Sequence, residues 1–385
     1  MQIPGRPIAL QLPRKLAFGA NCLAGAAEWI AGLDPKAVLI VTSPQVRALC
    51  EPLAEALRVQ GRRVGIWAEL QQEPHVDDLV RGLAAARDIH AELIVGLGGG
   101  SAMDVAKLIA ALLDGRQKIG EVFGIGNLRG RSTPLVCVPT TSGTGSEVSP
   151  IAIVQDSADG LKKGVISPHL VPDAAFVDPV LTVGMPPAVT ASTGLDALTH
   201  CIEAYANRQA HPLVDTWALE GIRRIARSLP AAVASGGDLA ARSDVSLGSM
   251  YGGMCLGPVN TAAVHALAYP LGSDFNVAHG TSNAVLLAHV LEFNLPAATQ
   301  RYADIALALG VPEEGSAEDM AAGGLEFIRQ LNRRCGIPAH ISELGVPDSA
   351  IDRMADSALT VQRLLAQNPR TVTLQDARDI YRRAF

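Results

Sequence analysis

The spacing of apolar and polar residues changes character near residue 186. Before that point, short apolar runs rich in β-branched residues alternate with segments in which apolar residues recur at helical spacing. Such alternation predicts an α/β domain, with a parallel or mixed sheet and helices on its faces. Strands are expected at residues 37–42, 64–70, 91–97, 135–140, 149–155, 162–167 and 174–179, and helices at residues 44–61, 76–90 and 101–115.

Beyond residue 186 the pattern is helical almost throughout. Residues 188–208 and 212–235 are rich in Ala and Leu, and strand signals are almost absent. Gly184 interrupts the periodicity, and the adjacent Pro186 and Pro187 disfavour a helix in the residues before them. We therefore expect an α/β domain at residues 1–185 and an all-α domain at residues 186–385.

Composition excludes some classes of function. The 385 residues carry a net charge of −6, and acids and bases are scattered along the chain. The sequence therefore predicts no positively charged surface for nucleic acid or an anionic membrane. No apolar stretch approaches the roughly 20 residues of a membrane span, and the N-terminal residues lack the apolar segment of a secretion signal. The six cysteines form no CxxC pair, which suits reduced thiols in the cytoplasm.

Four side chains of the helical half are candidates for a divalent-metal site. Asp196 and His200 lie four residues apart in TGLDALTHCIEAYA, so a helix would direct both the same way. His265 and His279 follow as lone imidazoles in mainly apolar segments. Each histidine alone is better explained as a core imidazole bonded to a backbone carbonyl, whereas the set of four favours a metal site.

GLGGGSAMDVAK, residues 96–107, leads an expected strand into three glycines and then a helix. Gly98, Gly99 and Gly100 would let the backbone approach a phosphate, whose charge the helix start would favour. Ser101 is expected to cap this helix, with Asp104 at capping-box spacing. The alternative is a tight turn that needs glycine for steric reasons alone. The run follows the third expected strand, not the first as in the usual dinucleotide fingerprint.

Hydroxyl groups gather in PTTSGTGSE, directly after another expected strand. Thr140, Thr141, Ser142 and Thr144 are placed to donate to phosphate or ribose. The alternative is a polar turn in which the same hydroxyls cap backbone groups.

From Ala37 to about Pro296 the chain resembles the iron-dependent (group III) alcohol dehydrogenase family. Five segments carry the resemblance, in this order: GGGSAMDVAK, PTTSGTGSE, GMPPAVTASTGLDALTHCIEAY, HALAYPLG and AHGTSNAVLL. The resemblance implies the dehydroquinate synthase-like fold: a Rossmann-like α/β domain of non-standard strand order, an all-α metal-binding domain and a cleft between them. It implies a metal-dependent, NAD(P)-linked alcohol dehydrogenase or aldehyde or ketone reductase. The metal would polarise the substrate oxygen, with hydride passing to or from C4 of the nicotinamide.

The family pattern also implies roles for single residues. Asp196, His200, His265 and His279 would bind the metal, which is Fe(II), although Zn(II) should bind the same donors at least as tightly. The cofactor, NAD or NADP, would contact Gly98, Gly99, Gly100, Ser101, Asp104, Thr140, Thr141, Thr144, Lys162 (with Lys163 as the fallback) and Leu181. The partners implied are a small alcohol or aldehyde substrate and further copies of the chain, in a homodimer or larger even-numbered oligomer.

Two positions depart from the family pattern. Ser43, expected beside the adenosine ribose, stands where many members have an acid that repels a 2′-phosphate, so either cofactor is expected to bind. Tyr269 stands where many relatives have a second histidine, four residues after the metal-binding one. We hypothesise that the Tyr269 hydroxyl bonds the substrate or a relay water. The alternative is a side chain that fills the cleft wall.

Two other functions remain open for this fold. One is a hydroxyacid–oxoacid transhydrogenase that keeps its cofactor bound. The other is a lyase of the dehydroquinate synthase type with tightly bound NAD. The lyase would call for clustered cations near the metal, but between Asp196 and Asn294 basic residues occur only from Arg208 to Arg242.

Overall fold

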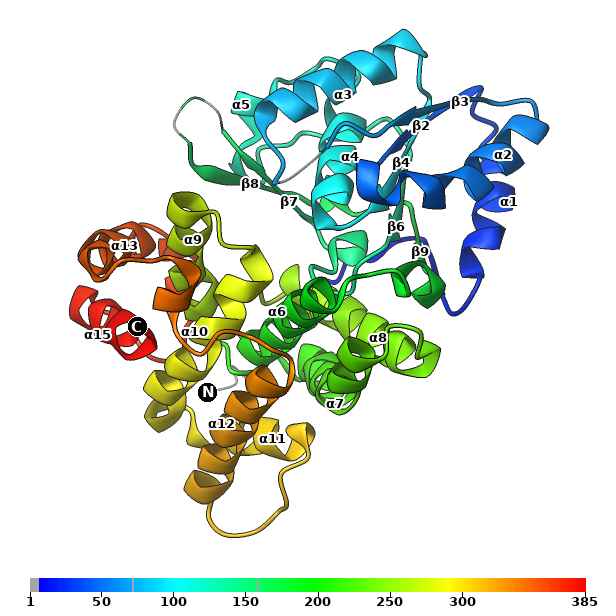
Figure 1. Cartoon of the computed structure of the whole chain (residues 1–385). Helices are drawn as coiled ribbons and strands as arrows, with labels where there is room; N and C mark the ends of the chain where they lie inside the picture. The colour runs from blue at the N-terminus through cyan, green and yellow to red at the C-terminus, as the bar shows by residue number, and fades with distance from the viewer. Residues whose placement is uncertain (1–6, 71–72, 157, 159) are drawn as a thin grey trace. The chain divides into compact units, whose positions relative to one another are not determined.

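The computed structural model describes residues 7–70, 73–156, 158 and 160–385, which form two compact units (Figure 1). The α/β unit comprises Gln11–Thr141 and Gly145–Val183. The helical unit comprises Gly184–Phe385, the short segment Ser142–Thr144 and the described residues 7–10. The two expected classes of structure, α/β followed by all-α, are confirmed.

The strands of the α/β unit are β1 (Lys15–Phe18), β2 (Ala37–Val41), β3 (Arg63–Trp67), β4 (Leu93–Gly98), β5 (Gly124–Ile125), β6 (Leu135–Pro139), β7 (Ile151–Gln155), β8 (Lys162–Ile166) and β9 (Ala174–Val177). Its α-helices are α1 (Ala26–Ala31), α2 (Glu51–Val59), α3 (Val76–Asp88), α4 (Gly100–Leu112) and α5 (Ile119–Val122). Three of its 3-10 helices matter below: η2 (Pro44–Cys50), η3 (Ser146–Val148) and η5 (Pro179–Thr182).

Six strands form a parallel sheet in the order β1-β9-β6-β4-β2-β3. From β2 the chain moves outward to β3 and then returns past β2 to β4, β6 and β9. This is a doubly wound order, and ligands of such sheets bind outside the carboxyl ends of the strands where the order reverses. Here the reversal lies between β2 and β4. A smaller sheet, β5-β8-β7, includes one antiparallel pair, so the expected mixed sheet is also found.

Helices cover both faces of the large sheet. Buried residues of α1 and α2 share one apolar cluster with β2, β4 and β6, and buried residues of α3 and α4 form the cluster on the opposite face. The strands in the middle are buried along their whole length, as in β2 and β6, because both of their faces are covered.

Two details differ from the sequence-based expectations. The strands β1 and β5 and the helices α1 and α5 were not expected, and because of β1 the glycine run follows the fourth strand along the chain rather than the third. β1 has only four residues, its two end residues are exposed, and it lies at the sheet edge, so it has no hydrophobic pattern to detect. The segment expected as one helix at residues 44–61 begins as the 3-10 helix η2.

The helical unit contains α6 (Pro187–Tyr205), α7 (Pro212–Ala234), α8 (Leu239–Leu256), α9 (Ala263–Phe275), α10 (His279–Asn294), α11 (Thr299–Leu309), α12 (Ala317–Arg334), α13 (Ile351–Leu359), α14 (Gln362–Leu365) and α15 (Leu374–Ala384). The helix α6 packs against α7, α8 and α10 and is buried over most of its length. Among the described residues, this unit contains no strand, and none of the chain's helices combines the length and apolar character needed to cross a membrane.

Charged side chains are buried where α4 lies against residues 146–153. Asp104 accepts hydrogen bonds from Ser146 Oγ at 2.6 Å and from the Ile153 backbone N–H at 2.9 Å. Lys107 Nζ donates to the carbonyls of Ser149 and Ile151, each at 2.8 Å. The expected capping box at Ser101 is therefore wrong. The helix begins at Gly100 after an N-cap Gly99 without a side-chain bond, and Asp104 instead ties α4 to the neighbouring segment.

Glu147 lies in the same buried region, in η3, and is only 3% exposed. Burial raises its pKa to about 7, mainly because the charged form loses water. A carboxyl whose pKa is higher in the folded protein favours folding below its unfolded pKa. That contribution is lost as the pH rises through the folded value.

Replacing Glu147 by Gln is therefore expected to stabilise the protein at pH 8 and to have little effect at pH 4.5. A difference of about 2.5 pH units between the folded and unfolded pKa corresponds to a change in the free energy of unfolding of at most about 3 kcal/mol. Urea unfolding of both proteins across pH 4.5–8 measures this difference. A constant difference in unfolding free energy over that range would contradict the argument.

Candidate active site

One face of α6 carries three polar side chains into the core of the helical unit. Asp196, His200 and Glu203 stand at positions i, i+4 and i+7, which a helix places in one row. They are 2%, 4% and 5% exposed, respectively. A row of buried ionisable groups must be compensated by partners, because charges are rarely buried alone.

The other two histidines come from a tight helix–turn–helix segment. His265 lies in α9, and His279 is the first residue of α10. Between the helices Asn276 adopts a left-handed conformation with φ of 55°, which ends α9 and reverses the chain. Gly280 then lies so close to the Ser192 backbone of α6 that a Cβ atom would overlap it. The glycine next to His279 thus lets α10 approach the helix that carries Asp196.

The three imidazoles converge on one carboxylate oxygen. Asp196 Oδ1 lies 3.8 Å from His200 Nε2, 3.5 Å from His265 Nε2 and 3.6 Å from His279 Nε2. Asp196, His265 and His279 offer ligand atoms that all lie within 4.8 Å of one another, and the His200 ring stacks on that of His265 at 4.8 Å between centroids. A tetrahedral ion with bonds of about 2.1 Å separates its ligand atoms by about 3.4 Å. Asp196, His265 and His279 therefore fit a divalent cation, and His200 Nε2 lies beside them, 3.8 Å from Asp196 Oδ1.

Protonation in this cluster follows from burial and from the carboxylates. Burial lowers the pKa of His200 to about 4, so this imidazole is neutral at pH 7. Burial opposes ionisation of Asp196, yet the neighbouring His200 and His279 hold its pKa well below the usual range. Burial also opposes protonation of His265, but hydrogen bonds with Asp196 and Glu203 raise its pKa to about 9. Metal binding at His265 would therefore release a proton at neutral pH.

Two residues that the sequence analysis did not single out complete the cluster. Glu203 Oε2 lies 2.6 Å from His265 Nδ1, and Glu203 Oε1 accepts from the Val264 backbone N–H at the start of α9. Asn283 Nδ2 donates to Asp196 Oδ1 at 2.7 Å and lies 3.2 Å from Nε2 of both His265 and His279. Helical spacing was the available signal, since Glu203 follows His200 by three residues and Asn283 follows His279 by four.

Tyr269 lies beside the cluster. Its ring is tilted over that of His279, with centroids 6.3 Å apart, and its side chain is partly buried. The helix α14 packs against α9, the helix that carries Tyr269. Burial raises the pKa of Tyr269, so the hydroxyl stays protonated at neutral pH and can donate a hydrogen bond.

The glycine run lies at the carboxyl edge of the large sheet. Gly98 ends β4, and a Cβ atom there would come within 2.8 Å of the Ala102 Cβ in α4, so this position requires close backbone packing. Thr140 donates its N–H to the Gly98 carbonyl, and Thr141 lies 3.5 Å from the position of a Gly99 Cβ. The uncapped N–H groups of the first turn of α4 offer an anion site. Gly99, Gly100, Ser101 and Thr141 are partly exposed there.

The other predicted cofactor residues are more widely placed. Ser43 follows β2 and is partly exposed, so it stands on the opposite side of the strand-order reversal from the glycine run. Lys162 lies in β8 and pairs with Glu73 at 3.0 Å, and Lys163 pairs with Asp156 at 2.7 Å. Leu181, in η5, packs against one apolar face of the sheet, and Thr144 belongs to the helical unit.

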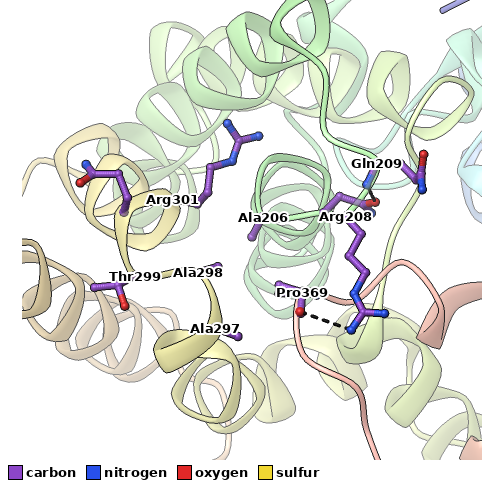
Figure 2. A pocket seen from close by; sticks show the side chains of 10 residues that line it. Ala206, Arg208, Gln209, Ala297, Ala298, Thr299, Arg301 and Pro369 are labelled. Carbon is purple, nitrogen blue, oxygen red and sulfur yellow. Dashed lines mark hydrogen bonds between the residues drawn. The ribbon is translucent and has the colours of Figure 1, made fainter. Parts of the chain in front are cut away.

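A pocket of about 840 Å³ in the helical unit contains none of the predicted site residues (Figure 2). Its two arginines are already engaged. Arg301 makes a two-pronged ion pair with Asp215 at 2.8 Å, and Arg208 bonds Thr371 and the Pro369 carbonyl. Arg301 is therefore committed to a carboxylate, whereas the bonds of Arg208 run to neutral oxygen atoms.

The fold and the metal cluster define a class of enzyme, and comparison with known proteins gives the same class. Residues 13–179 match the iron-containing alcohol dehydrogenase family model, and residues 190–385 match the model for the C-terminal part of the Fe-containing alcohol dehydrogenase family. The chain belongs to the iron-containing alcohol dehydrogenase family. It is a metal-dependent oxidoreductase of alcohols and aldehydes.

The relatives it resembles extend over nearly the whole chain. Long-chain-alcohol dehydrogenase 1 from Geobacillus thermodenitrificans is 40% identical, over 92% of this chain and 90% of the relative. The 1,3-propanediol dehydrogenase of Klebsiella pneumoniae is 35% identical over 97% of this chain and 98% of its own. A crystal structure of 1,3-propanediol oxidoreductase superimposes with a TM-score of 0.96 at 35% identity, covering 99% of this chain and 100% of that one.

Replacing Glu203 by Gln is expected to weaken metal binding by about 10- to 100-fold, because the amide orients His265 less firmly and makes it a poorer donor. Equilibrium dialysis against Fe(II) or Zn(II), followed by metal analysis, measures the dissociation constant directly. Asp304→Asn is the matched control, since Asp304 accepts a hydrogen bond from Tyr205 outside the cluster. Equal metal affinity of Glu203→Gln and the parent protein would show that Glu203 does not support the site.

Proposed function

We propose that this chain is an NAD(P)(H)-dependent alcohol dehydrogenase that also runs as an aldehyde or ketone reductase. The observation that carries the proposal is the convergence of His200, His265 and His279 on Asp196 Oδ1. Fe(II) is the proposed native metal, and Zn(II) is expected to occupy the same donors. The relatives named for long-chain alcohols, 1,3-propanediol and lactaldehyde support alcohols and short aldehydes as the substrate range.

In this proposal Asp196, His200, His265 and His279 hold the metal, which would act as a Lewis acid on the substrate oxygen. Glu203 fixes the ring of His265 and leaves its Nε2 lone pair directed at the cluster. Asn283 holds the Asp196 carboxylate by its amide N–H. The Tyr269 hydroxyl stays protonated and donates a hydrogen bond to the substrate, the role proposed from its position beside His279.

The proposed cofactor site is the carboxyl edge of the large sheet. Backbone N–H groups at the start of α4 would bind the pyrophosphate, with Thr140 and Thr141 at the neighbouring strand end. The nicotinamide supplies or accepts the hydride. The engaged carboxylate of Asp104 gives this residue a supporting role, because its hydrogen bonds hold α4 against residues 146–153.

The function is tested by following absorbance at 340 nm with a panel of alcohols and aldehydes, both cofactors, and protein loaded with Fe(II) or Zn(II). Net turnover is expected, and Asp196→Asn should lower kcat/KM by about 1,000-fold, because it removes the negative ligand on which the imidazoles converge. Exchange between an alcohol and a carbonyl compound without free NAD(P)H would instead identify a transhydrogenase. Turnover of neither kind, with retained NAD, would favour the lyase.

Cofactor choice depends on Ser43 in this proposal. Ser43→Asp is expected to raise the KM for NADP(H) by at least about 10-fold and to leave that for NAD(H) nearly unchanged, because a carboxylate would repel a 2′-phosphate. Ser43→Asn is the uncharged control. Equal effects of both variants on both cofactors would place Ser43 away from the ribose.

The proposal also includes the cytoplasm as the compartment and an even-numbered homo-oligomer as the assembly. The cysteines support the first part, since all six are free thiols and five are buried. The assembly rests on the family resemblance, and sedimentation would measure it.

A further inference from the structure

Ser142 is one of the four hydroxyl residues expected to face phosphate or ribose, but the structure gives its hydroxyl a partner inside the protein. Its Oγ lies 2.8 Å from the Oγ of Ser246 in α8, and both residues are only 3% exposed. In such a pair one hydroxyl donates and the other accepts, so each satisfies a buried polar atom of the other. Ser142 is therefore buried and bonded within the helical unit.

The segment of residues 142–144 is held by two helices of that unit. Its first residue bonds α8. Gly143 lies against α6, because a Cβ atom at this glycine would come within 2.8 Å of Thr193 Cβ and 3.2 Å of its Cα. Thr141 and Thr144, which flank the buried pair of residues, are partly exposed. The loop is thus fixed at its buried middle, and two hydroxyl residues proposed for the cofactor lie directly beside that point.

The chain reaches this segment from the glycine run. Thr140 donates its N–H to the Gly98 carbonyl at 2.9 Å, and the Thr141 side chain lies 3.5 Å from the position of a Gly99 Cβ. Thr141 is followed directly by Ser142, and adjacent residues share a rigid peptide plane. A shift of the Ser142 backbone therefore changes the direction of the Thr141 side chain.

The helix α8 is held in place independently of this bond. Arg242 precedes Ser246 by four residues, so it lies on the same face of α8, and it is 1% exposed. Its guanidinium donates to the Thr190 hydroxyl at 2.7 Å and to the carbonyls of Gly236 at 3.0 Å and Met185 at 3.3 Å. These bonds fasten α8 to the start of α6 and the residues before it. Loss of the Ser246 hydroxyl is therefore expected to release the loop and to leave α8 in place.

A simpler role for the serine pair is to fill a buried position. Mutual hydrogen bonding offsets the cost of burying two hydroxyls, but two small apolar side chains would fill the same space at least as well. The pair instead joins residues 104 positions apart, at the point where the loop between Thr141 and Thr144 enters the helical unit. A hydrogen bond there fixes direction as well as distance, which apolar contact does not.

We propose that Ser246 is a positioning residue for the dinucleotide cofactor. Its bond to Ser142 sets the backbone of residues 140–144. The Thr141 and Thr144 side chains thereby keep the arrangement that receives a phosphate or a ribose. Ser246 acts through Ser142 and does not itself touch the cofactor. This inference rests on the proposed function, which places the pyrophosphate at the start of α4, and adds a residue of α8 to those that determine cofactor affinity.

The test measures the dissociation constants of NADH, NADPH and ADP-ribose by calorimetric titration of the metal-loaded protein. ADP-ribose lacks the nicotinamide, so its binding depends on no reaction. Ser246→Ala and Ser142→Ala are each expected to raise these constants by about 5-fold, because the loop loses a hydrogen bond. The double variant should raise them no further than either single variant, because both changes remove the same bond. In steady-state assays the KM for the cofactor should rise, with kcat within about twofold of the parent value.

Ser249→Ala is the matched control, because Ser249 is also a buried serine of α8, three residues beyond Ser246 and 2% exposed. It should leave all three dissociation constants unchanged. Equilibrium dialysis should find the same metal content in every variant, which separates an effect on the loop from general damage to the helical unit.

Two outcomes would overturn the inference. If Ser246→Ala lowers the free energy of unfolding but binds the nucleotides as tightly as the parent protein, the pair only fills space, and the proposed cofactor site itself stands. If the parent protein binds none of the three nucleotides, the proposed function fails, and this inference fails with it.

Discussion

The structure of the helical unit depends on burying the carboxylate of Asp196. A carboxylate removed from water is strongly unfavourable unless it is paired and fully hydrogen-bonded. Here one of its oxygens receives the amide of Asn283 and faces three imidazole nitrogens. Apolar side chains of α6, α7, α8 and α10 pack around this polar cluster. The helices are therefore held at distances that suit this polar centre as well as their apolar side chains.

Close backbone approach makes that arrangement possible. Gly280 lets α10 lie directly against the Ser192 backbone. A Cβ atom at Gly252 of α8 would lie only 3.2 Å from His200 Cβ, so α8 also lies close to α6. A larger residue at Gly280 would push His279 away from Asp196, and the cluster would lose one of its nitrogens. Helix packing thus also sets the geometry of the proposed metal site, because Gly280 stands next to His279 and packs against the helix that carries Asp196.

Much of this site can be predicted from the sequence, because several of its residues are brought together by helical spacing. The pair Asp196 and His200 follows from a regular helix, and the long motifs identified the family. Glu203 and Asn283 were missed, although they obey the same spacing, because an acid and an amide in a helix are usually exposed. Their partners lie 62 and 87 residues away in the chain, and such contacts are set by tertiary packing.

In the α/β unit, the sequence predicts the central strands but not the edge strand or the helix cap. Its central strands are apolar on both faces and were easily found, whereas β1 has four residues at an edge and carries little pattern. The capping box at Ser101 failed for a physical reason. Asp104 accepts hydrogen bonds from Ser146 Oγ and the Ile153 N–H, which hold α4 against the neighbouring segment, so its carboxylate does not cap the helix end.

The two units would balance the charges of their proposed ligands in different ways. In the α/β unit, the start of α4 offers backbone N–H groups and no side-chain cap, so the proposed pyrophosphate would replace the cap without a local lysine. In the proposed function, a chain of net charge −6 would hold a phosphate group in this way. In the helical unit, the buried carboxylates of Asp196 and Glu203 would offset the charge of the proposed divalent cation.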